Sequence, residues 1–176
     1  MCILNIKGLR FYGRLNDDHL KALFKVANVL NREDVRGIKG VYCIDGKIKK
    51  IDKDKEYLVA SYVQFTKITK DGCVVLDMNY SNGDKEIIRI YKSPIITING
   101  NLCYSEQQFV FNLLHEIGHH NDKFSINGVE KEIIAHLFAL ERICRIYDKL
   151  EYEVLSKYKY FEQAMEEFKD RGLLYK

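Results

Sequence analysis

The segment from Leu114 to His120, LHEIGHH, constrains this 176-residue chain more than any other part of it. It contains a His-Glu-x-x-His pattern formed by His115, Glu116 and His119. Residues four apart lie on one face of an α-helix, so the two imidazoles can bind one zinc ion. The carboxylate of Glu116 can then reach a water on that ion and act as a general base. The pattern predicts a catalytic metal site, and the alternative is a surface helix that happens to carry histidines.

The composition is that of an ordinary globular protein, with 47% hydrophobic and 30% charged residues. The net charge of +3 is small and the charges are mixed, which argues against a nucleic-acid partner. We find no run of about 18 apolar residues, so no membrane span is expected. The five cysteines are widely spaced without a Cys-x-x-Cys pair, and no export signal is recognised. These features favour a cytoplasmic protein.

The spacing of apolar residues predicts an α+β fold in a single domain, residues 1–176. Residues 1–104 are expected to form an N-terminal helix and a mostly antiparallel, twisted sheet, and residues 105–176 to be helical. We predict one strand over 3–12, a helix from its Asn16 cap to about residue 31 with His19 exposed, and a strand over 57–69. Two hairpin turns are expected, at Asp45-Gly46 and at Ser81-Asn82-Gly83.

A short strand from Pro94 to Asn99 completes the predicted sheet. Proline cannot donate to a strand ladder, so we expect this to be an edge strand. The active-site helix begins at a capping box made by Ser105 and Gln108. A break at residues 123–128 separates it from a second helix, and one further helix is expected between Leu150 and a stop at Gly172.

A catalytic zinc ion usually has three protein ligands, so a third is needed. His119 lies about four residues before the break and Glu132 about four residues after it, or ~6 Å along each helix. In an antiparallel pair of helices, these two side chains reach the same height. Glu132 is therefore the preferred third ligand. His136, one turn further on, is its rival, and Glu130 is less well placed near the helix start.

The roles of three other residues in or next to the motif are less definite. His120 points about 100° away from His119, so it is expected to be exposed or hydrogen-bonded at the helix end. Asp122 is either an orienting partner of a ligand imidazole or a helix-end residue. Gly118 costs a helix about 1 kcal/mol relative to alanine, which suggests close approach of a neighbouring backbone, such as the sheet or the substrate.

Residues 95–139, about a quarter of the chain, resemble the gluzincin class of zinc metallopeptidases and most of all the ImmA/IrrE type. The matching features are a strand ending in Ile98-Asn99, the motif from Phe111 to His119, and a following helix with Glu132, Ala135, Phe138 and Ala139. The resemblance implies a zincin-like fold. It also implies His115, His119 and Glu132 as zinc ligands and Glu116 as the catalytic base.

The chain departs from that type in two respects. The gap from His119 to Glu132, 132 − 119 = 13, is shorter than usual, and His136 replaces the more common Asn or Asp. Asp122, three residues after the second histidine, also resembles the lethal-factor and Pro-Pro endopeptidase type, whose members are secreted.

These observations predict a zinc-dependent endopeptidase whose peptide or protein substrate lies along the strand from Pro94 to Asn99. His136 is a candidate oxyanion donor if it is not a ligand, and so is a tyrosine of the C-terminal helix. The alternative is a catalytically silent binding module of the same fold, acting in regulation or in toxin–antitoxin pairing.

Overall fold

The computed structural model describes residues 2–44, 46–49, 60–63, 74–80, 85–91 and 94–172. It begins with a β-hairpin in which β1 (Cys2–Ile6) and β2 (Leu9–Gly13) pair antiparallel. Lys7 and Gly8 have φ angles of 52° and 97°, the left-handed conformations that a tight two-residue turn requires. The side chain of Asn5 accepts a hydrogen bond from the Gly8 N–H at 3.0 Å. The single strand predicted over residues 3–12 is therefore wrong, because a turn divides it.

The N-terminal helix is confirmed as α1 (Asp17–Val29), followed by the short α2 (Arg32–Val35). The Asn16 side chain caps α1 by accepting a hydrogen bond from the His19 N–H at 2.8 Å. The prediction that His19 is exposed is wrong. Its side chain lies on the buried face of the helix, and its ring stacks on Phe109 with centroids 4.4 Å apart.

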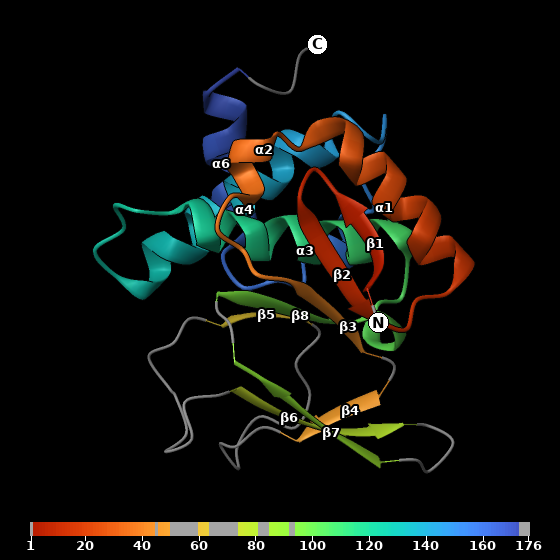
Figure 1. The fold of residues 1–176 in the computed structure, drawn as a ribbon. Helices are drawn as coiled ribbons and strands as arrows, with labels where there is room; N and C mark the ends of the chain where they lie inside the picture. Colours follow the sequence, from red (N-terminus) through yellow and green to blue (C-terminus); the bar gives the residue numbers. More distant parts are fainter. Residues whose placement is uncertain are drawn as a thin grey trace.

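A five-stranded mixed sheet supports the site, in the order β1-β2-β3-β8-β5 (Figure 1). Its other members are β3 (Val41–Ile44), β5 (Ala60–Val63) and β8 (Ile95–Asn99). The β2–β3 and β3–β8 pairs are parallel, and β5 pairs antiparallel with β8. The predicted edge position of the Pro94–Asn99 strand is wrong, because β8 has a partner on both sides. All five of its residues are buried, as in the interior strands of a covered sheet.

A second, three-stranded antiparallel sheet has the order β4-β6-β7, formed by β4 (Gly46–Lys49), β6 (Val74–Tyr80) and β7 (Lys85–Ile90). The β6–β7 hairpin is confirmed, although its turn at residues 81–84 lies outside the described residues. The hairpin predicted at Asp45-Gly46 is wrong, because β3 and β4 belong to different sheets. Of the strand predicted over 57–69, only β5 lies within the described residues.

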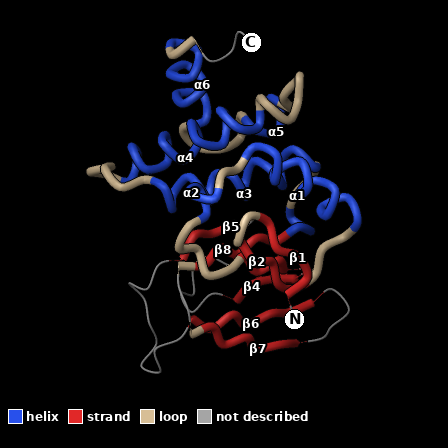
Figure 2. Tube along the Cα trace, turned by 45° about the horizontal axis from the view of Figure 1, so that its top comes forward, coloured by secondary structure: helices blue, strands red, loops and turns tan. Residues whose placement is uncertain are grey.

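Of the six strand pairs in the described chain, four are antiparallel and two are parallel. The molecule therefore mixes helices and strands in a way that is compatible with the predicted α+β class. The helices lie on one face of the five-stranded sheet and the three-stranded sheet lies on its other side (Figure 2). Within the described residues, no helix is both long and apolar enough to cross a bilayer.

The helical layer is centred on α3 (Glu106–Asn121), which contacts β8 and β5 below it and both α1 and α4 (Gly128–Ile143) beside it. After a 3₁₀ turn (Gly100–Leu102), the Ser105 hydroxyl caps α3 by accepting from the Gln108 N–H at 3.1 Å. The single C-terminal helix predicted after Leu150 is wrong. It is divided into α5 (Tyr152–Leu155) and α6 (Phe161–Asp170), with Tyr160 at a φ of 67° between them.

The backbones of α3 and α4 meet at Gly118. A Cβ atom added to Gly118 would lie 2.8 Å from the Cα and 2.9 Å from the carbonyl oxygen of Ala135. Real side chains do not approach a backbone so closely, so only glycine allows this distance between the helices. The expected close approach of a neighbouring backbone is confirmed, and the neighbour is α4.

We predict that Gly118→Ala lowers the free energy of unfolding. The added methyl must push α4 away, which costs about 1–3 kcal/mol and is only partly offset by a gain of at most about 1 kcal/mol in helix propensity. Urea unfolding followed by circular dichroism measures the difference.

Gly128→Ala is the matched control, because a Cβ there has no atom within 4 Å. The control is expected to change the free energy of unfolding by less than about 0.5 kcal/mol. Equal stability of the two variants would contradict the close helix contact.

Candidate metal centre

The motif lies in the C-terminal half of α3, on the turns that face α4. His115 and Glu116 are buried, with 9% and 8% of their surfaces exposed, and His119 is partly buried. The rings of His115 and His119 have centroids 4.5 Å apart and meet edge to face. The predicted placement of the two imidazoles on one face of one helix is therefore present in the structure.

Glu132 projects from α4 towards both imidazoles. Its Oε2 lies 3.3 Å from His115 Nε2 and its Oε1 lies 3.5 Å from His119 Nε2. One carboxylate thus spans two histidines from the neighbouring helix, with one oxygen directed to each. The Glu132 side chain is 43% exposed, so this side of the cluster is open to solvent.

His136 closes the opposite side of the cluster. It is 2% exposed and its ring centroid lies 4.4 Å from that of His115. Donor atoms of His115, Glu132 and His136 all lie within 4.8 Å of one another, so this trio could hold a metal ion. His119 is not one of these three residues. Its Nε2 lies near Oε1 of Glu132, whereas His115 lies near Oε2. The structure thus brings His115, His119 and Glu132 together with His136, the residue predicted as the alternative third ligand.

The charges in the cluster favour metal binding. Burial, reinforced by the neighbouring His115, lowers the pKa of His119 to about 4. The same two causes lower the pKa of His136 to about 4. A hydrogen bond with His115 is the main reason that the pKa of Glu132 is lowered. At neutral pH the imidazoles of His119 and His136 are therefore neutral and Glu132 is a carboxylate, the protonation states that bind a metal.

Two buried nitrogens in the cluster, the Nδ1 atoms of His115 and His136, have no hydrogen-bond partner. Leaving a buried polar atom unpaired costs about 1–3 kcal/mol. Imidazole nitrogen and carboxylate oxygen are also the donors that zinc takes in hydrolases. The unpaired Nδ1 of His136 and the donor types of the cluster both fit a zinc ion, whereas the Nδ1 of His115 has no bearing on it, because the Nε2 of that ring faces Glu132.

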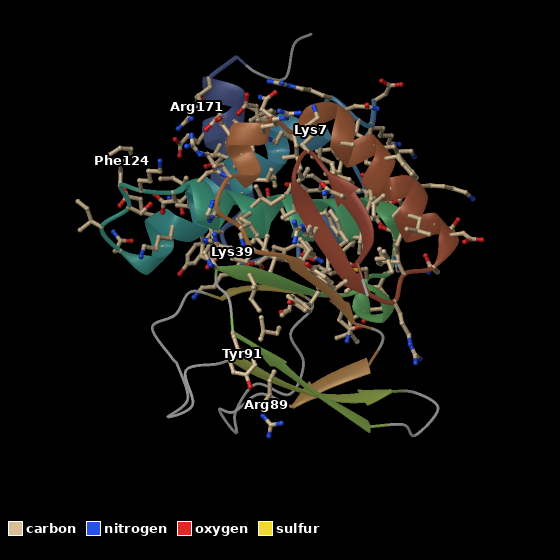
Figure 3. The ribbon with its side chains drawn as sticks, in the orientation of Figure 1. Lys7, Lys39, Arg89, Tyr91, Phe124 and Arg171 are labelled. Atoms are coloured by element: carbon tan, nitrogen blue, oxygen red, sulfur yellow. The ribbon has the colours of Figure 1, made fainter. Side chains whose placement is uncertain are left out.

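Neighbouring candidates have other partners. Asp122 is the C-cap of α3, and its Oδ1 accepts from the backbone N–H groups of Phe124 and Ser125. Its partial burial opposes ionisation, but those hydrogen bonds hold the pKa of Asp122 below its usual value. Asp122 is therefore a helix-end residue, the second of the two roles predicted for it. The loop that it shapes carries Phe124, which is 88% exposed, beyond the ends of both helices (Figure 3).

His120 and Glu130 also contribute to structure around the site. His120 Nε2 lies 2.9 Å from the carbonyl oxygen of Arg36, which is the hydrogen bond expected at the helix end. The carboxylate of Glu130 accepts a hydrogen bond from the Ile126 N–H at 2.8 Å, across the first turn of α4. Neither residue is part of the trio that could hold a metal ion.

The segment between α5 and α6 supplies two groups near the cluster: the Lys159 carbonyl, which sequence reasoning missed, and Tyr158, one of the C-terminal tyrosines among which it could not choose. The carbonyl oxygen of Lys159 lies 2.9 Å from His136 Nε2, and the Tyr158 hydroxyl accepts from Gln108 Nε2 at 3.0 Å. Burial is the main reason that the pKa of Tyr158 is raised, and the charge of Glu116 acts in the same direction. No local pattern predicts these contacts, because their partners are 23 and 50 residues apart.

Comparisons of the chain with models of protein families, with characterised proteins and with solved structures found no match. The function must therefore be argued from the chemistry and geometry of this cluster alone.

We predict that the metal-free protein loses stability as the pH falls from about 6.5 to about 4. In the folded state the pKa values of His119 and His136 are about 4, below the ordinary value of 6.5. The unfolded chain therefore binds more protons than the folded chain throughout this interval, so acid favours unfolding, and the effect is absent above it.

Urea unfolding at a series of pH values, in the presence of a chelator, measures this dependence. His136→Asn is expected to make it shallower, and His120→Asn, which removes an imidazole outside the cluster, is the control. A free energy of unfolding that rises towards pH 4 would contradict the lowered pKa values.

Proposed function

We propose that this protein is a zinc-dependent endopeptidase, with His115, His119 and Glu132 as the residues that hold the ion. The observation that carries the proposal is the position of the Glu132 carboxylate, 3.3 Å and 3.5 Å from the two imidazoles of the motif. A surface helix that carried histidines by chance would not bury them opposite a carboxylate from the next helix.

Glu116 is the proposed general base. Zinc bound in such a site lowers the pKa of a water molecule towards about 7 and polarises a substrate carbonyl. Glu116 accepts a proton as the water oxygen adds to the peptide carbonyl carbon. It then gives a proton to the nitrogen as the C–N bond breaks, leaving a carboxylic acid and an amine. Its position one residue after His115 places this base beside the ion rather than on it.

We propose that the substrate binds as an extended strand along β5. The sequence predicted this role for the Pro94–Asn99 strand, but that strand is β8, which is paired on both sides. Within the described chain, β5 is one of the two edge strands of the five-stranded sheet, and it contacts α3. The outer edge of such a strand offers N–H and C=O groups for main-chain pairing. A peptide added there would lie beside the helix that carries His115, Glu116 and His119.

We propose a cytoplasmic location for the enzyme. Cys43, Cys103 and Cys144 are free cysteines, and burial raises the thiol pKa of each, to about 12 for Cys43 and about 11 for Cys103. Free thiols are typical of a reducing compartment. The proposed partners are peptides or proteins, with no nucleic acid and no membrane.

We predict that the purified protein binds about one zinc ion per chain and cleaves members of a broad peptide library. Glu116→Gln is expected to keep the zinc and to lower cleavage by at least about 100-fold, because general acid–base catalysis contributes on that order. Metal content is measured by plasma mass spectrometry and cleavage by mass spectrometry of the digest.

Glu153→Gln, at an exposed position on α5, is the matched control and is expected to cleave as the wild type does. Cleavage by Glu116→Gln at the wild-type rate would refute the mechanism. Zinc binding without cleavage of any peptide would instead favour the catalytically silent binding module.

A further inference from the structure

His136 is a polar residue in an apolar setting. Its ring lies against Phe111 and Phe161, with centroids 5.5 Å and 6.2 Å away, and only 2% of its surface is exposed. Aromatic packing of this kind leaves little access for water, so any partner for the ring nitrogens must come from the protein or from a bound ion.

The hydrogen bond to Lys159 determines which nitrogen is available. A carbonyl oxygen can only accept, so the 2.9 Å contact with the Lys159 carbonyl places the ring proton on Nε2. Nδ1 then carries a lone pair, and it is buried without a hydrogen-bond partner. An imidazole that donates one N–H to a backbone carbonyl and offers its other nitrogen is the usual form of a metal-bound histidine.

The His136 ring lies within reach of the proposed ion. Donor atoms of His115, Glu132 and His136 lie within 4.8 Å of one another. Ligands around a tetrahedral zinc ion with bonds of about 2.0–2.1 Å lie roughly 3.4 Å apart. A bound ion would therefore have to draw these side chains together by no more than about 1.5 Å.

We infer that His136 is a fourth protein ligand, binding through Nδ1, so that three imidazoles and one carboxylate hold the zinc ion. This inference rests on the proposed function, because it assumes an ion bound by His115, His119 and Glu132. Four protein ligands complete a tetrahedral site. An ion held by four protein residues would lack an open position, so catalysis there would require the ion to release one ligand or to accept a fifth.

X-ray absorption at the zinc edge tests the inference, because scattering from the imidazole ring counts histidine ligands directly. The zinc-loaded full chain is expected to show three imidazoles. His136→Asn is expected to show two and to bind zinc at least about tenfold more weakly, a loss in the range found even for residues that only support a ligand. His120→Asn, whose imidazole bonds to Arg36 instead, is the control and is expected to keep all three.

Two imidazoles in the wild-type protein would overturn the inference without any variant, so a failure of His136→Asn to fold does not affect the test. Cleavage that depends on Glu116, together with two imidazoles, would reject the fourth ligand and leave the peptidase proposal intact. Three imidazoles without cleavage would support the fourth ligand and reject the peptidase. A protein that binds no zinc would reject both.

Discussion

The contact between Gly118 and Ala135 determines how closely α3 and α4 approach, and the cluster depends on that distance. Gly118 lies between His115 and His119 on one helix, and Ala135 lies between Glu132 and His136 on the other. This close backbone contact therefore lies among the four polar side chains. A larger residue at either position would move the carboxylate away from the imidazoles, because tightly packed helices adjust only as units.

Polar contacts outside the site hold the same helices in place. Asp34 of α2 is the common partner: its carbonyl accepts from Asn121 of α3 at 2.8 Å, and its carboxylate accepts from Arg142 of α4 at 2.9 Å. The Arg142 and Asp34 side chains are only 12% and 13% exposed, so little water competes for this ion pair. The site is thus built on helices that α2 ties together at one end, as a preorganised constellation of ligands requires.

The features that the sequence predicted correctly are those that depend on residues close together in the chain. The Asn16 cap, the faces of α3 and the facing position of Glu132 follow from helical periodicity and from a short break between antiparallel helices. Strand order could not be predicted, because β8 becomes an interior strand only through β3 and β5, which pair with it from distant parts of the chain. The hydrogen bond between His136 and the Lys159 carbonyl could not be predicted either. Every residue has a backbone carbonyl, so the sequence does not indicate which one a side chain contacts.

Anomalous diffraction at the zinc absorption edge, from crystals of the zinc-loaded protein, tests most directly whether the crossing of α3 and α4 is a metal centre. The account predicts one strong peak between the imidazoles of His115 and His119 and the carboxylate of Glu132. No peak there after zinc loading, or a peak only at other residues, would contradict it.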